Sequence, residues 1–158
     1  MRVLTIPVLA AFLLAGCAGP RSLVPGQSTE TDVRAQMGAP RETRTEPNGD
    51  LVWEYPTGPE GFTTYSVRLG ADRKVKSVTQ LVSEEQLGKV VVGKSTRDDV
   101  RRILGRPAEE TVYHAGPTWY WRFLRNGTST GYLIVTFDSA GIATSKAATQ
   151  DSYPAAKF

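Results

Sequence analysis

Few residues of this sequence have the type and spacing to do chemistry. The segment from Gly88 to Ser95 fits the Gly-x-x-x-x-Gly-Lys-Ser spacing of a phosphate-binding loop, in which backbone amides and a Lys hold phosphate groups. It contains three consecutive Val residues, which suit a packed segment, and Glu84-Glu85 precede it instead of an apolar strand. His114, the only histidine, lies beside Gly116-Pro117, as is typical of a solvated loop. We therefore expect no nucleotide site, no catalytic site and no cofactor.

Cys17, the only cysteine, is the strongest chemical candidate. The apolar stretch from Val3 to Leu14 precedes it. This stretch is shorter than the roughly 20 residues of a transmembrane helix but is typical of a signal peptide. Leu14-Ala15-Gly16-Cys17 resembles the bacterial lipobox, in which the thiol forms a thioether to diacylglycerol and cleavage leaves the Cys as the new N-terminus. We predict a signal peptide over 1–16 and lipidation at Cys17; the alternative is an ordinary secretory signal followed by an incidental Cys.

Lipidation at Cys17 also predicts a location. One acyl chain binds a membrane only reversibly, whereas the two or three chains of a bacterial lipoprotein anchor it stably. Ala18 follows the Cys, where an Asp would indicate retention in the inner membrane. We expect the protein at the outer membrane, facing the periplasm, with 17–22 as a lipidated tether.

Composition excludes several classes of protein. The chain has 158 residues, of which 40% are hydrophobic and 22% charged, so we expect one domain or two small repeats and not a disordered chain. Its net charge of +3 is scattered, whereas a nucleic-acid-binding protein concentrates Lys and Arg on one face. One His and one Cys are too few for a structural zinc site or a disulfide framework.

An internal repeat organises the rest of the sequence. Gly26–Pro40 aligns without gaps with Gly93–Pro107, and Gly, Ser, Thr, Asp, Val, Arg, Gly and Pro recur in that order at the same spacing. Such self-similarity indicates a duplication. We predict a first repeat over 23–86, a second over 87–150 and a C-terminal tail over 151–158.

Each repeat is expected to begin with a short helix. Ser28 and Ser95 are the expected N-caps, and Asp98 follows Ser95 at the spacing of a capping box. Gly38 and Gly105 are placed to end the helices, each with a Pro two positions later.

The helices are also predicted to be amphipathic. Val33 in the first helix and Val100 in the second each begin an apolar stripe, whereas Arg34, Arg101 and Arg102 are expected to face water.

Three strands are predicted to follow each helix. Alternating or β-branched patterns indicate strands over Leu51–Tyr55, Thr63–Leu69, Val75–Val82, Trp119–Leu124, Tyr132–Phe137 and, more weakly, Ile142–Ala148. Turns are expected at Asp72-Arg73-Lys74 and Asn126-Gly127. The predicted fold is α+β, with two tandem repeats of short helices followed by a three-stranded antiparallel meander.

The repeated motif resembles a known family. Gly-x-Ser-Thr-x-x-Asp-Val, then Leu/Met-Gly-x-Pro, then an aromatic strand, on a chain with a lipobox, resembles the SmpA/OmlA, or BamE-like, family of outer-membrane lipoproteins. The duplicated unit also looks like the fold of the β-lactamase inhibitor protein. The resemblance covers roughly 23–82 and 87–150 and implies a role in the outer-membrane β-barrel assembly machine. The family's best-known member has one unit, whereas this chain has two, and no binding residue lies in the shared motif.

The second aromatic strand carries the predicted binding residues. Trp119, Trp121 and Phe123 face one side of it and Tyr120 and Arg122 the other, because side chains alternate along a strand. Aromatic and Arg side chains are enriched in binding hot spots, so Tyr120 and Arg122 are predicted to bind a protein partner. The alternative is that they simply cover the outside of the sheet.

These observations favour a non-catalytic, protein-binding lipoprotein of the outer membrane. Its expected partners are envelope proteins, including subunits of the β-barrel assembly machine. The alternative is an inhibitor that binds a periplasmic or secreted hydrolase through its sheet face. An enzyme that acts through His114 has the least support.

Overall fold

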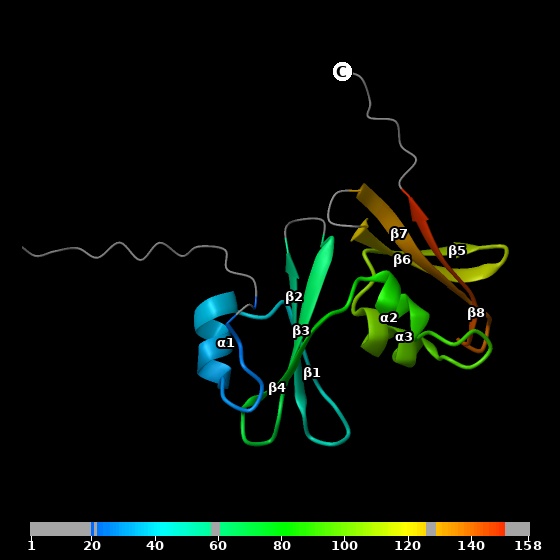
Figure 1. Cartoon of the computed structure of the whole chain (residues 1–158). Coiled ribbons are helices and arrows are strands. Elements are labelled where there is room, and N and C mark those ends of the chain that lie inside the picture. Colours follow the sequence, from blue (N-terminus) through cyan, green and yellow to red (C-terminus); the bar gives the residue numbers. More distant parts are fainter. Residues whose placement is uncertain (1–19, 21, 58–60, 126–128, 151–158) are drawn as a thin grey trace, which may run out of the picture.

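Two units follow one another along the chain (Figure 1). The computed structural model describes residues 20, 22–57, 61–125 and 129–150. The first unit contains α1 (Glu30–Met37), β1 (Glu42–Thr45), β2 (Leu51–Thr57), β3 (Thr63–Leu69) and β4 (Val75–Gln80). The second unit contains α2 (Glu84–Gly88), α3 (Arg97–Leu104), β5 (Glu109–Tyr113), β6 (Gly116–Arg125), β7 (Ser129–Phe137) and β8 (Ala143–Gln150).

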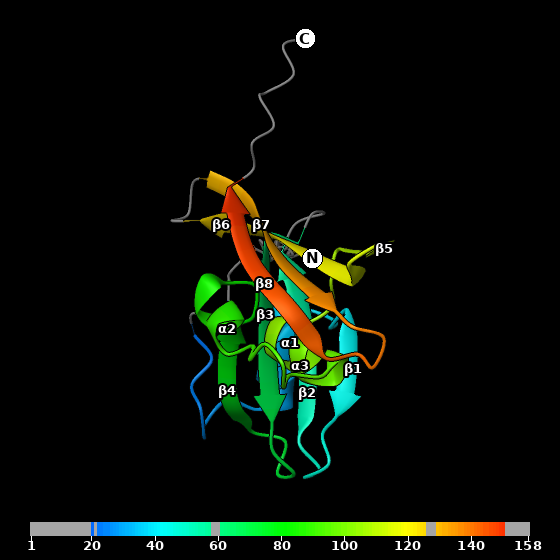
Figure 2. The same ribbon diagram turned by 90° about the vertical axis from the view of Figure 1, so that its right-hand side faces the viewer.

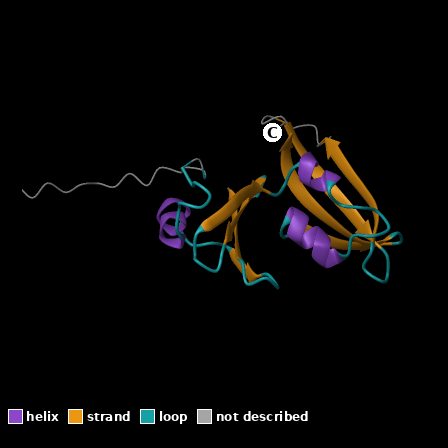
Figure 3. Cartoon of the chain, turned by 60° about the horizontal axis from the view of Figure 1, so that its bottom comes forward, coloured by secondary structure: helices purple, strands orange, loops and turns teal. Residues whose placement is uncertain are grey.

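Each unit has one four-stranded antiparallel sheet, in the orders β1-β2-β3-β4 and β5-β6-β7-β8. Within each sheet, strands that follow one another in the sequence therefore pair. A view turned by 90° has β8 crossing the front of the molecule (Figure 2). The elements stack in four layers: α1, the first sheet, α2 with α3, and the second sheet (Figure 3). Helix α3 thus lies between the two sheets.

The α+β class is confirmed, but the prediction of three strands per unit was wrong. β1 and β5, the additional strands, each form one edge of a sheet. Glu42–Thr45 contains no apolar residue, and Glu109–Tyr113 is exposed at all but one position. Neither segment has the apolar alternation by which strands are recognised. The predicted Asn126-Gly127 turn lies outside the described residues.

Threonines cap the two repeated helices. Thr29 Oγ1 accepts a hydrogen bond from the Asp32 amide at 3.3 Å, and Asp32 Oδ2 accepts one from the Thr29 amide at 2.7 Å. Thr96 and Asp99 form the same capping box, at 3.1 and 3.0 Å. Both helix starts therefore have the same hydrogen bonds.

The predicted caps at Ser28 and Ser95, with Asp98 as the capping-box partner, were wrong by one residue. Ser28 Oγ accepts a hydrogen bond from the Val24 amide at 2.8 Å, and Ser95 Oγ accepts one from the Val91 amide at 2.9 Å. Each Ser closes the turn before its helix, so the next residue becomes the N-cap.

The helix ends are also alike. Gly38 and Gly105 have φ angles of 77° and 75°, which a residue with a side chain rarely adopts. The Tyr55 hydroxyl donates a hydrogen bond to the Gly38 carbonyl at 3.4 Å, and Trp121 Nε1 donates one to the Gly105 carbonyl at 3.1 Å. In both units an aromatic residue of the second strand therefore holds the helix end onto the sheet.

Each unit has its own apolar core. The first contains Leu23, Val33, Trp53, Tyr55, Val67, Leu69 and Val75. The second contains Leu81, Val82, Leu87, Val90, Val100, Leu104, Trp121, Phe123, Leu133, Val135, Phe137 and Ala143. Leu81 and Val82 precede α2, so the second core begins before its first helix.

We expect Gly105→Ala to destabilise the protein more than Gly38→Ala. Both changes force a side chain into the same unusual backbone conformation, at a cost of about 1–3 kcal/mol. A Cβ at Gly105 would also lie 2.9 Å from Leu81 Cδ1 and 3.2 Å from Glu54 Oε2, whereas a Cβ at Gly38 meets nothing within 4 Å. Denaturant unfolding of both variants measures the difference. An equal loss at the two positions would contradict the crowding at Gly105.

Candidate functional site

The structure places Tyr120 and Arg122 on one face of β6, which we call the outer face of the second sheet. Trp121 and Phe123 point to the opposite face and are buried in the second core. Leu124, in line with Tyr120 and Arg122, is exposed. The side chains of β6 therefore alternate as predicted, and the outer face is the one that α2 and α3 do not cover.

Tyr120 belongs to a group of tyrosines on this outer face. Its ring meets that of Tyr132 edge-on, with 6.3 Å between centroids. A hydrogen bond with Tyr113, together with burial and the negative charge of Glu109, raises the pKa of Tyr120 to about 12. The Tyr120 hydroxyl is therefore engaged with Tyr113 within the second unit, and the Tyr120 ring contributes to the outer face.

The Arg122 side chain is half-buried and lies beside aromatic rings of both units. Its guanidinium lies 4.9 Å from the ring centre of Phe62, in the first unit, and 5.7 Å from that of Tyr132. Cation–π attraction to both rings joins the two units. Arg122 therefore connects the outer face to the junction between the units.

A cavity of about 320 Å³ lies at this junction. It is lined by Arg41, Glu42, Glu54, Pro56, Gly61 and Thr64 of the first unit and by Val82, Arg106, Pro107, Ala108, Trp121 and Arg122 of the second. Its charged lining is mixed, with three guanidinium groups and two carboxylates. Arg122 is the predicted site residue that reaches this cavity.

The first sheet presents a polar face to the second unit. Glu54 is 3% exposed, Val52 1%, and Thr64 and Ser66 are also buried, although none of them belongs to the first core. The opposite face of the same strands carries Trp53 and the other core residues. The second unit therefore covers a sheet face that contains a carboxylate.

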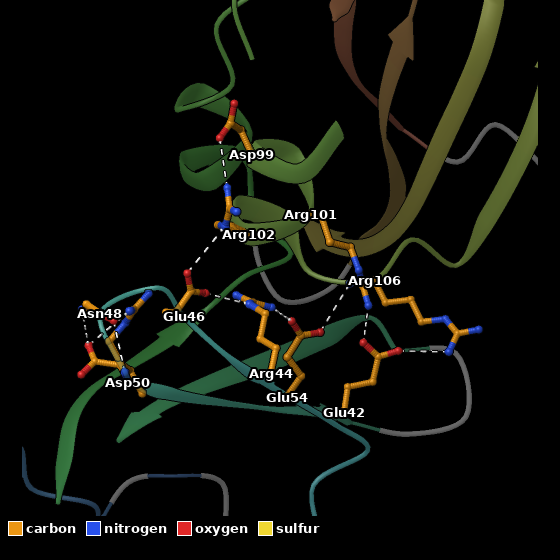
Figure 4. A network of polar contacts seen from close by, with 11 residues as sticks. Glu42, Arg44, Glu46, Asn48, Asp50, Glu54, Asp99, Arg101, Arg102 and Arg106 are labelled. Carbon is orange, nitrogen blue, oxygen red and sulfur yellow. Dashed lines mark hydrogen bonds and ion pairs between the residues drawn. The ribbon is translucent and has the colours of Figure 1, made fainter. Parts of the chain in front are cut away.

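Ion pairs cross the junction from β1 and its following turn to the second unit (Figure 4). Glu42 pairs with Arg101 and, at 3.0 Å, with Arg106. Glu46 pairs with Arg102 at 3.6 Å. Arg101 and Arg102 lie on α3, so the helix that packs on the second sheet also contacts carboxylates of the first unit.

The prediction that Arg101 faces water was wrong, because Arg101 is half-buried at the junction; Arg102 is exposed, as predicted, and also pairs with Glu46. The prediction was based on helical periodicity within one unit, which does not reveal the neighbouring sheet. Arg34 in α1 has no such sheet beside it; it is exposed, and its guanidinium lies 4.4 Å from the ring centre of Trp53. The equivalent arginines of the two helices thus have different partners.

No catalytic arrangement is present in the described residues. His114 is exposed in the turn between β5 and β6. Ser129 lies in a Gly-x-Ser-x-Gly pattern that the sequence analysis missed, but this pattern leads into β7 instead of joining a strand to a helix. His114 precedes the first residue of β6 (Gly116–Arg125), and Ser129 pairs with its last residue. A strand of ten residues is about 30 Å long, so the two side chains lie roughly that far apart. They therefore cannot act together.

The remaining chemical candidates also lack a site in the described part of the chain. The three valines within Gly88–Ser95 were expected to pack, which is wrong for two of them: Val90 is buried, but Val91 and Val92 are 49% and 45% exposed. The Val91 amide donates a hydrogen bond to Ser95 Oγ, so this amide does not point toward a bound phosphate. The residues at 20, 22–57, 61–125 and 129–150 contain no cluster of three or more metal-ligating His, Cys, Asp or Glu. None of their helices is long and apolar enough to cross a membrane. Cys17 and the predicted signal peptide lie outside the described residues.

The fold and these surfaces define a two-unit α+β protein with an aromatic outer face and a charged junction. Residues 80–147 match the family model of the outer membrane protein assembly factor BamE domain. This segment of the chain is therefore a BamE domain, as the sequence motif predicted. It comprises α2, α3 and the second sheet nearly to its end; the match does not extend to the first unit.

Other comparisons add little. No curated protein sequence matches the chain significantly. Among solved structures, a DUF4309 family protein, YjgB, from Bacillus subtilis aligns over 83% of this chain and 84% of its own, with 16% identity and a TM-score of 0.33. A TM-score this low does not establish a common fold.

We expect the protein to lose stability in acid through Glu46, whose strongest partner is Arg44 of the same unit. The hydrogen bond from Arg44, with the charges of Arg44, Arg68 and Arg102, holds the pKa of Glu46 below its usual 4.5, against the opposing effect of burial. A carboxyl whose pKa is lower in the folded state stabilises the fold fully above its unfolded pKa, and this contribution is lost as pH falls through the folded pKa. Glu46→Gln should therefore destabilise the protein at neutral pH and reduce the loss of stability between about pH 5 and pH 3.

Denaturant unfolding at several pH values measures this effect. Glu110→Gln is the control, because Glu110 is exposed on β5 and forms no ion pair with the described residues. Equal acid sensitivity of the two variants would show that Glu46 does not contribute.

Proposed function

We propose that this protein is a lipoprotein anchored in the outer membrane, which faces the periplasm and binds envelope proteins without catalysing a reaction. The observation that carries the proposal is the BamE domain over residues 80–147. That family is named for outer membrane protein assembly factors, so the expected partners are components of the β-barrel assembly machine.

We further propose that the first unit is a second, diverged copy of the same BamE-like repeat, which resembles the β-lactamase inhibitor protein in architecture. The proposed boundaries, taken from the sequence repeat, are 23–86 and 87–150, with a tail over 151–158; α2 (Glu84–Gly88) spans the first boundary and packs in the second core. The matching capping boxes support a common origin. The equivalent hydrogen bonds from Tyr55 to the Gly38 carbonyl and from Trp121 to the Gly105 carbonyl also support a common origin. The two sheets also have the same strand order.

The proposed lipid anchor at Cys17 would keep the first unit close to the membrane. The tether 17–22 is short, and Leu23 is already buried in the first core. An extended chain spans at most about 3.5 Å per residue, so the core would begin within about 20 Å of the lipid. A partner would then meet the protein near the membrane surface.

The proposed protein-binding residues are Tyr120 and Arg122. Tyr120 supports a contact with a partner because its ring is partly exposed beside Tyr132 on the outer face. Arg122 would act mainly by holding Tyr132 and Phe62 in place, since its guanidinium lies over both rings.

Replacing the lipidated residue tests the anchor. The Cys17→Ser variant cannot form the thioether, so it should incorporate no labelled palmitate and disappear from the outer-membrane fraction. Ala18→Ser makes a similar change next to Cys17 and keeps the thiol, so it should retain the label. A Cys17→Ser protein that still fractionates with the outer membrane would contradict the anchor.

Crosslinking in cells tests the binding face. A photoreactive aromatic amino acid at Tyr120 should capture a subunit of the β-barrel assembly machine, identified by mass spectrometry. The control position is Val112, which is 76% exposed on β5. Capture of a single soluble hydrolase would favour the inhibitor function instead. The absence of any adduct specific to Tyr120 would show that this face is not used.

A further inference from the structure

The free edge of β8 is the least protected strand edge in the described part of the chain. β8 pairs with β7 on one side. On its other side, Ala143 exchanges hydrogen bonds with Gly93 and Ser95, both at 2.8 Å. From Thr144 to Thr149 the described residues supply no further backbone partner on that side, and all of these residues except Ala148 are exposed. β8 lies at the front of the molecule in Figure 2.

The other three sheet edges differ from this one. β1 has only four residues, and its Glu42 and Arg44 form ion pairs. β5 has five residues and begins with two acids. β4 has six residues, and its last four are half-buried. Short strands and charged side chains are the usual means by which proteins prevent an edge from pairing with another strand.

β8 has neither protection. It contains no acid and no Pro over its eight residues, Ala143–Gln150. Its one charged side chain, Lys146, donates hydrogen bonds to the carbonyls of Leu87, Gly88 and Val90 at 3.2, 3.0 and 2.6 Å. The ammonium is therefore held against the end of α2 and does not repel a strand that approaches the edge.

The other side chains of β8 allow a close approach. Ala143, Ala147 and Ala148 have small side chains. The hydroxyls of Thr144 and Thr149 donate to carbonyls of β7, at 3.2 and 3.5 Å, and so turn toward the sheet. Another backbone could therefore approach without a large side chain in its way.

We propose that the free edge of β8 binds an extended segment of a partner polypeptide as a fifth strand of the second sheet. The recognised chemistry is the main chain itself, through alternating N–H and C=O groups. The preferred segment is uncharged and β-branched, because small side chains on β8 leave room for larger ones beside them. This inference deepens the proposed protein-binding function and rests on it.

The outer face and the edge are separate surfaces of the same sheet. Tyr120 lies on β6, and β7 stands between β6 and β8. A partner could contact the face through side chains and the edge through its backbone. The two contacts can be tested independently, so a failure at the β8 edge leaves the crosslinking result at Tyr120 unchanged.

A strand peptide provides the probe. A synthetic peptide of about ten alternating Thr and Val residues, flanked by Lys for solubility, matches a typical strand in length. It is added to the full chain in detergent, and amide hydrogen exchange is followed by mass spectrometry over the segment 143–150. We expect exchange there to slow by about tenfold, because the peptide protects amides of the free edge.

Two controls identify main-chain pairing. The same peptide with N-methyl groups on alternate residues keeps its side chains but loses the N–H donors along one of its edges. It should therefore slow amide exchange over the segment 143–150 less than the unmodified peptide does. Ala147→Lys places a charge on β8 that repels the Lys-flanked peptide, and should weaken protection several-fold. Val112→Lys places the same charge on β5 and should have no effect.

Other outcomes would overturn the proposal. Equal protection by the N-methylated peptide would show that side chains are recognised instead of the edge. If the peptide slowed amide exchange only in β5, or in neither β5 nor β8, strand addition at β8 would also be excluded. If segment 143–150 already exchanges slowly without peptide, the edge has another occupant: a second copy if protection rises with protein concentration, and part of the same chain if it does not.

Discussion

The structure depends on helix α3, which packs against two sheets at once. Val100 and Leu104 must face the second sheet, because they complete its apolar core. That requirement turns Arg101 and Arg102 toward the first unit, where Glu42 and Glu46 meet them. Glu42 and Glu46 of the first unit thus form ion pairs with the two arginines of α3 that do not face the core of the second unit. The ion pairs of this short helix therefore help to fix the relative position of the units, together with the contact of Arg122 with Phe62.

A second constraint acts within each unit. A helix of eight residues is too short to be stable alone, so hydrogen bonds at both ends help to stabilise it. The capping box holds the start, and an aromatic donor from the second strand of the sheet holds the carbonyl of the Gly at the end. The aromatic residues of these strands therefore fill the core and also fix where each helix ends.

The packing of the helices on the sheets determines which sheet surfaces stay accessible to a partner. α2 and α3 cover one face of the second sheet, and α3 also covers the polar face of the first. The outer face of the second sheet and the edge of β8 remain accessible in the described part of the chain. These two surfaces belong to the unit that is a BamE domain, and this is where we place the binding of partners.

The sequence by itself determined the class of fold and the family of the second unit. Local patterns carry that information: Gly38 and Gly105 end helices because of their backbone freedom, and alternation separates Trp121 from Tyr120 on β6. The structure then shows that the face with Trp121 is the buried one. The edge strands β1 and β5 escaped prediction because hydrogen bonding, and not apolar alternation, defines them. Only the tertiary structure decided that Arg101 and Arg102 are ion-paired and that Arg122 lies over Phe62. Their partners are far away in sequence, and helical or strand periodicity tells which way a side chain points but not what lies opposite.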